Sequence, residues 1–172
     1  MTWTAPEIAR VNEPSVADER HMLEGWLEWH RQTLLHKCTG LTAEQLKQAT
    51  VEPSTLTLLG LVRHMAEVER WWFRRHAAGQ DIGDLYCTDA SPDGDFDDLE
   101  GADAKEDFVT YLAECELARA AVTDLSLEHT FTHSRRGEVS LRWVYVHMIE
   151  EYARHNGHAD LLRERIDGIT GT

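Results

Sequence analysis

Apolar residues recur at helical spacing over most of the chain, and capping residues, glycines and prolines divide this pattern into four long segments. The first is predicted to begin near Ser15, which forms a capping-box-like pair with Asp18, and to end with His36 and Lys37 before Gly40. The other three are predicted to run from Pro53-Ser54 to Arg74-Arg75-His76 before Gly79, from Asp103, with Glu106 completing a capping box, to the region of Asp124, and from Ser140 to the residue before Gly168.

Two of the connections between these segments are predicted to carry short elements, and the third to be a loop. Residues 43–49 are predicted to form a short helix opened by Thr42 and Gln45, and residues 131–139 fit a turn or a short hairpin. Residues 79–101 hold four glycines, Pro92 and most of an acidic run, so we expect a long loop between the second and third long helices. No strands alternate with helices, which predicts an all-α four-helix bundle spanning residues 1–172 as a single domain.

The fourth long helix carries polar residues on the face that its apolar residues place inward. At about 100° per residue, its apolar stripe comprises Leu141, Val144, Met148, Tyr152, Ala159, Leu162 and Ile166. Glu151, His155 and His158 fall inside or beside this stripe, and His147 lies next to it. Burial of an unpartnered carboxylate is costly, so we expect Glu151 to face a cation, a metal ion or a water-filled cleft.

A histidine on the second long helix can complete this polar group. His64 lies at the edge of the apolar stripe of that helix. The charged residues of the helix gather on its opposite side: Arg63, Glu67, Arg70 and Arg74. Glu151 and His155 are one helical turn apart and can bind one ion from the same face, with His64 as a third ligand from a facing helix. Three protein ligands leave coordination positions open, and this set suits zinc, Fe(II), nickel or manganese.

Simpler interpretations of the same residues stay open at this point. Glutamate and histidine one turn apart are common on helix surfaces, and a histidine on an apolar face is usually a hydrogen-bonded core residue. His147 and His158 either hold the ligands from outside or line a polar pocket. His30 is expected to pack in the core, and Glu69 to form a salt bridge.

The net charge argues against one class of partner. The 172 residues include 31 acids and 17 bases, and residues 81–107 contain eleven acids and one base, so this stretch carries −10 of the formal charge of −14. A polyphosphate backbone is repelled by such a chain, so nucleic acid is not an expected partner. We expect the acidic run to form a solvated loop that says little about the site. Its aspartates imitate a calcium loop, but Asp98 and Ala104 stand where an EF-hand requires Gly and Glu.

The hydropathy pattern and the cysteines indicate the cellular compartment of the protein. No apolar run approaches the roughly 18 residues of a membrane span, and the N-terminus lacks the regions of a signal peptide. Cys38, Cys87 and Cys115 form no CxxC pair and are expected to be reduced thiols. Cys115 has no recognisable basic partner, so a catalytic thiolate is not expected there. A cytoplasmic protein without a membrane partner is the prediction.

Two segments resemble a known family. Residues 58–73 are similar to the second helix of DinB/YfiT-like proteins, and residues 147–158, HMIEEYARHNGH, are similar to their metal-binding fourth helix. The likeness covers nearly the whole chain and is most specific to the branch of the mini-circle protein. Most members place two histidines on the last helix, whereas Glu151 stands four residues before His155 here. The related mycothiol-dependent maleylpyruvate isomerases use a His/Glu/His zinc set, so the resemblance implies His64, Glu151 and His155 as ligands.

The resemblance also implies a function. It predicts a metal-dependent enzyme, an S-transferase or isomerase, that uses mycothiol or another low-molecular-weight thiol against a small electrophile. Zinc is the expected metal, and a homodimer is the expected assembly. In this scheme His147 or His158 orients a ligand or carries a proton. The alternative is a non-catalytic metal-binding stress or regulatory protein of the same family. A third interpretation, a purely structural domain with a hydrogen-bonded polar face, requires no metal.

Overall fold

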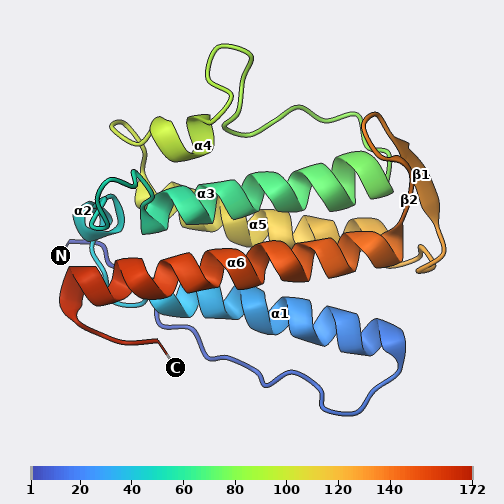
Figure 1. Ribbon diagram of the computed structural model, residues 1–172, viewed down its shortest axis with the longest axis horizontal. Coiled ribbons are helices and arrows are strands. Elements are labelled where there is room, and N and C mark those ends of the chain that lie inside the picture. Colours follow the sequence, from blue (N-terminus) through green and yellow to red (C-terminus); the bar gives the residue numbers. More distant parts are fainter. Residues whose placement is uncertain (1, 172) are drawn as a thin grey trace.

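The computed structural model describes residues 2–171, and these residues are mostly helical. Their elements follow in the order α1 (Glu19–Cys38), α2 (Ala43–Leu46), α3 (Leu58–Glu69), the π-helix η1 (Arg70–Ala77), α4 (Gly94–Asp97), α5 (Ala104–Val122), β1 (Thr130–His133), β2 (Gly137–Ser140) and α6 (Leu141–Asp167). The segments α1, α3 with η1, α5 and α6 lie side by side along the long direction of the molecule (Figure 1). The core between them includes Phe73, Tyr111 and Tyr152, which are among the largest fully buried side chains.

The helix ends agree with the sequence where local hydrogen bonds define them. The short helix α2 has the predicted capping box of Thr42 and Gln45, although it stops at Leu46. Ser140 caps α6, and Gly168 ends it in the left-handed conformation, with φ of 80°. The predicted start of the first helix is wrong, because Asp18 rather than Ser15 accepts the hydrogen bond from the His21 amide and caps α1.

Other helix ends differ in detail from the prediction. The second long helix starts after Thr57, which caps it, rather than directly after Pro53-Ser54. Its last two turns are π-helical, a change that the apolar spacing does not indicate. Asp103 caps α5 as expected, but within residues 2–171 Glu106 does not return the side-chain bond of a capping box. Residues 131–139 form the hairpin rather than a simple turn, with Phe131 paired to Val139.

The segment between η1 and α5 is not a solvated loop throughout. It contains α4 and lies over α3 (Figure 1). Gly60 of α3 permits this contact, because a Cβ atom there would lie 3.2 Å from the Phe96 ring. Arg63 and Glu67, on the polar side of α3, are therefore buried beneath the segment instead of facing water.

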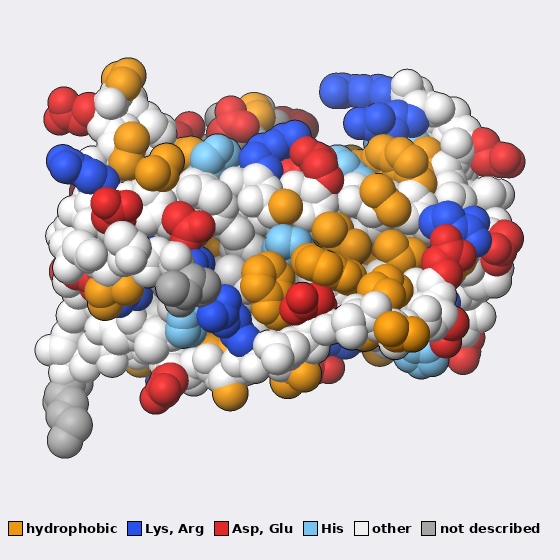
Figure 2. Space-filling view, turned by 60° about the horizontal axis from the view of Figure 1, so that its bottom comes forward, with side chains coloured by type: hydrophobic (Ala, Val, Ile, Leu, Met, Phe, Trp, Pro, Cys, Tyr) orange, Lys and Arg blue, Asp and Glu red, His pale blue; other side chains and the backbone are white. Residues whose placement is uncertain are grey.

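The outer surface has one apolar region that the figures make visible. Figure 2 presents the face turned forward from the bottom of Figure 1, where α1 and the segment before it lie, and hydrophobic side chains gather near its middle. Large exposed hydrophobic residues of the chain include Trp26 and Val146. None of the helices within residues 2–171 combines the length and the apolar character needed to cross a membrane.

Candidate metal centre

Three residues from two helices meet beside the core. His64 of α3 and Glu151 and His155 of α6 each offer a ligand atom, and these atoms all lie within 4.8 Å of one another. Glu151 Oε2 lies 3.5 Å from His155 Nε2, and the ring centroids of His64 and His155 are 4.8 Å apart. His155 is buried, whereas His64 and Glu151 are half-buried. The structure thus brings together the three residues that the sequence singled out.

Local helix geometry accounts for two of the three positions. Glu151 and His155 are four residues apart, so both side chains point from the same face of α6. The buried residues Met148 and Tyr152 fix that face against the core. His64 is placed by packing of α3 against α6, which no local pattern specifies.

Asp95 is the residue that sequence reasoning missed. It belongs to the acidic run, yet it is only 3% exposed, and its Oδ2 lies 2.7 Å from His64 Nδ1. A carboxylate accepts hydrogen bonds, so the Nδ1–H of His64 donates here, and Nε2 is the ring nitrogen left to face a metal ion. The signal in the sequence was Phe96 with Gly94, an apolar residue and a glycine within an otherwise acidic stretch, which is typical of a packed turn.

The electrostatics of the cluster favour neutral imidazole at His155. Burial, followed by the charges of the neighbouring His64 and His158, lowers the pKa of His155 to about 3. His158 Nδ1 lies 3.4 Å from His155 Nδ1. A neutral imidazole keeps a lone pair available to a metal ion, whereas an imidazolium does not.

His147 lies on the other side of Glu151. Its Nε2 is 3.6 Å from Glu151 Oε1, and its ring stacks on Trp143 with centroids 4.7 Å apart. Burial lowers the pKa of His147. His147, Glu150 and Glu151 also bring ligand atoms within 4.8 Å of one another, but Glu150 forms an ion pair with Arg154. That pair makes this second group a weaker candidate for a metal ion.

Two side chains of α3 hold the segment that carries Asp95. Arg63 donates hydrogen bonds to the carbonyl oxygens of Gly94 and Asp95, at 3.0 and 3.1 Å, and its guanidinium lies 4.1 Å from the centre of the Tyr86 ring. Glu67 accepts hydrogen bonds from the amides of Leu85 and Tyr86, at 2.9 and 2.7 Å. The buried charges of α3 therefore position the Asp95 carboxylate against His64.

A cavity opens next to the cluster. Its volume is about 270 Å³, and His64 and Asp95 form part of its wall, together with the aromatic residues Trp71, Trp72 and Phe96. Phe96 stacks on His64, with ring centroids 4.7 Å apart. Trp72 is buried, and both tryptophans face this cavity.

A comparison with models of protein families identifies the family of the chain. A model described as mycothiol-S-transferase matches residues 22–168. The chain belongs to the mycothiol S-transferase family. The resemblance to DinB/YfiT-like proteins and the link to mycothiol are thereby confirmed. No significant match to the chain was found among curated proteins or among solved structures.

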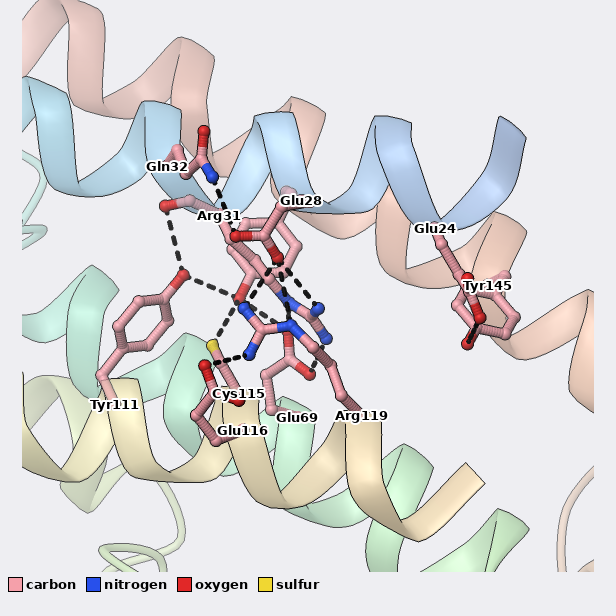
Figure 3. A network of polar contacts seen from close by, with 11 residues as sticks. Glu24, Glu28, Arg31, Gln32, Glu69, Tyr111, Cys115, Glu116, Arg119 and Tyr145 are labelled. Carbon is pink, nitrogen blue, oxygen red and sulfur yellow. Dashed lines mark hydrogen bonds and ion pairs between the residues drawn. The ribbon is translucent and has the colours of Figure 1, made fainter. Parts of the chain in front are cut away.

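This member of the family also contains a buried polar network away from the three candidate ligands. Arg31 donates two hydrogen bonds to Glu69, at 2.7 and 2.6 Å (Figure 3). Tyr152 donates a third hydrogen bond to Glu69, at 2.8 Å. Glu69 is 0% exposed, so the predicted salt bridge exists but lies in the core. Arg31 also lines a larger cavity of about 640 Å³, where Glu28 and Arg119 form an ion pair. His30 is buried as expected, beside Asn156.

The three cysteines remain protonated thiols. Burial raises the pKa of Cys38 and of Cys115 to about 12. Burial, followed by the charge of Asp95, raises the pKa of Cys87 to about 11. None of the three is a ready nucleophile at neutral pH.

Proposed function

We propose that the chain is a divalent-metal-dependent enzyme, of S-transferase or isomerase type, that uses mycothiol or another low-molecular-weight thiol. His64, Glu151 and His155 are the proposed metal ligands. The observation that carries the proposal is that these three donors, from two helices, converge within 4.8 Å beside an open cavity. Membership of the mycothiol S-transferase family supports the choice of thiol and, between the two reaction types, transfer.

The donor set fits a divalent ion. Asp95 holds the proton of His64 on Nδ1, His155 is neutral, and Glu151 supplies a negative charge. Two imidazoles and one carboxylate leave coordination positions for a substrate, which a catalytic site requires. We expect zinc, while nickel, iron and manganese accept the same ligands.

The chain's own residues complete the chemistry. A divalent ion held by these ligands would lower the pKa of a thiol bound to it and so supply a thiolate at neutral pH. We propose that His147 or His158, which lie beside Glu151 and His155, orients a ligand or takes up the thiol proton. Trp71, Trp72 and Phe96 exclude water from one side of the substrate.

The proposal also covers the fold type, the cellular location and the assembly of the protein. We propose a four-helix bundle of DinB/YfiT type, formed by α1, α3 with η1, α5 and α6 as one domain, in a cytoplasmic protein without a nucleic-acid partner. A homodimer is proposed as well, and the hydrophobic side chains gathered on the face in Figure 2 support it.

Metal analysis and a conjugation assay test the proposal together. The purified protein, loaded with zinc and dialysed, is expected to retain one ion per chain and to accelerate the attack of a thiol on 1-chloro-2,4-dinitrobenzene, which forms the thioether and releases chloride and a proton. His155→Ala is expected to lose both the metal and the acceleration. Glu150→Gln is the matched control, because it removes a carboxylate from the second group only, and it is expected to keep both.

Contrary outcomes are equally specific. Full activity of a His155→Ala protein that has lost its metal would contradict the proposal. Stoichiometric metal without conjugation of any thiol would favour the alternative, a non-catalytic metal-binding stress or regulatory protein. The cavity beside His64 is the observation that favours the enzyme, because a purely structural metal site has no need of an open approach.

A further inference from the structure

The cavity beside His64 has an unusual charge balance. Four carboxylates, those of Glu67, Asp84, Asp93 and Asp95, belong to its wall, and no lysine or arginine is among its lining residues within the described chain. A cavity of one sign of charge with apolar walls concentrates its electrostatic field and discriminates between ligands by charge.

The four carboxylates are compensated to different degrees. Asp84 forms an ion pair with Arg75 at 2.7 Å, and Asp95 accepts the hydrogen bond of His64. Glu67 accepts backbone amide hydrogen bonds and pairs with no lysine or arginine among residues 2–171. Asp93 is exposed and makes no side-chain capping bond at the start of α4, so its carboxylate is free to meet a ligand at the mouth of the cavity.

Two arginines near the cavity are already engaged. Arg75, whose guanidinium lies 4.6 Å from the centre of the Trp71 ring, offsets the charge of its partner Asp84. Arg63 lies under the segment, where its guanidinium is engaged by the carbonyl oxygens of Gly94 and Asp95. A divalent ion in the proposed site would add two positive charges, and Glu151 and Asp95 together offset them. Glu67 and Asp93 then leave the cavity net negative even in the metal-loaded protein.

We propose that this cavity binds the part of the thiol substrate beyond the sulfur atom and selects thiols without a carboxylate. The inference rests on the proposed function, since it names the class of thiol that the same site accepts. A neutral or cationic body lies against Trp71, Trp72 and Phe96, whereas a carboxylate there is repelled by Asp93 and Glu67 and meets no lysine or arginine in the lining.

A matched pair of thiols tests the inference. N-acetylcysteine amide and N-acetylcysteine differ only in the presence of a carboxylate, and each enzymatic rate is divided by the uncatalysed rate of the same thiol to remove the difference in thiol reactivity. The zinc-loaded protein is expected to prefer the amide by about tenfold or more in kcat/KM at low salt, and less at high salt. Equal normalised rates for the two thiols would overturn the inference.

Variants of one residue identify the source of the selection. Asp93→Asn is expected to reduce the preference several-fold, and Asp93→Lys to abolish or reverse it, because both act on the carboxylate at the mouth of the cavity. Asp89→Asn is the matched control, since Asp89 is an exposed acid of the same segment that does not line the cavity, and it is expected to leave the preference unchanged. A preference that survives Asp93→Lys would contradict the assignment.

A binding measurement separates this inference from the proposed function. The S-methyl derivatives of the same two compounds cannot react, and their binding to the protein is measured by NMR titration. Tighter binding of the amide derivative is expected, again lost in Asp93→Lys. If no thiol is conjugated but the amide derivative binds more tightly, the proposed function fails and the selection stands. If thiols are conjugated without a preference for the amide, the selection fails and the function stands.

Discussion

Asp95 accepts a hydrogen bond from His64 at 2.7 Å, and this contact connects the acidic segment to the candidate metal centre. A carboxylate behind a histidine fixes the ring orientation and raises its basicity as a ligand. Asp95→Ala is therefore expected to weaken zinc binding about 10- to 100-fold, with a smaller loss in Asp95→Asn, whose amide oxygen still accepts the bond. Competition with a chelator measures the affinity. Asp97→Asn, an exposed neighbour in α4, is the control, and equal affinity in all three variants would contradict the role of Asp95.

Arg63 holds the segment that carries Asp95, so its removal is expected to loosen the segment before the rest of the protein. In Arg63→Ala the bonds to Gly94 and Asp95 are lost, together with the contact to the Tyr86 ring. Hydrogen exchange of the amides in residues 83–98 is expected to accelerate, while exchange in α6 changes little. Arg142→Ala, which removes exposed ion pairs at the start of α6, serves as the control. Uniformly accelerated exchange throughout the chain would point to global destabilisation instead.

The pair of Arg31 and Glu69 is expected to be important for stability. Glu69→Ala leaves the buried Arg31 guanidinium with the longer 3.5 Å contact to Glu28 in place of its two bonds to Glu69, and is predicted to lower the free energy of unfolding by about 3 kcal/mol. Replacement of both residues by methionine is expected to cost less than the single change, because no uncompensated charge then remains. Urea denaturation measures both. Glu19→Ala removes an exposed pair and is expected to cost no more than about 1 kcal/mol.

The burial of His30 is expected to make the stability of the metal-free protein fall as the pH is lowered. Burial lowers its pKa, and Asn156 Nδ2 donates to its Nδ1 at 3.2 Å, which requires an unprotonated nitrogen. Because the pKa of His30 is lower in the folded state, the unfolded chain takes up the proton first as the pH falls. The stabilisation is therefore complete above the unfolded pKa of about 6.5 and is lost between that pH and the folded pKa.

The contribution of His30 to the pH dependence of stability has an upper limit. One histidine contributes a slope of at most about 1.4 kcal/mol per pH unit to the free energy of unfolding. His30→Gln is expected to flatten the dependence on pH below about 6.5 in urea titrations of the metal-free protein, because glutamine does not titrate there. An unchanged slope in that variant would exclude His30 as a source of the acid sensitivity.

Part of the candidate site could be predicted because it depends on local periodicity. The spacing of Glu151 and His155 places both on one face of a helix whatever the rest of the chain does. His64 was a candidate because it lies at the edge of the apolar stripe of its helix, and the likeness of residues 58–73 to a family segment supported that choice. Asp95 could not be found in this way, because an acidic run looks solvated unless the path of the segment over α3 is known. The burial of Arg63 and Glu67 escaped prediction for the same reason.

The sequence by itself determined the helical segments and several of their ends, since capping by Thr42, Asp103 and Ser140 depends on bonds to residues two or three positions away. It also determined which face of α6 turns inward. Only the tertiary structure decided that the segment from η1 to α5 folds onto α3, that Asp95 meets His64, and that a cavity with four carboxylates in its lining opens beside them. These contacts join residues about thirty positions apart, and side-chain packing selects them rather than backbone periodicity.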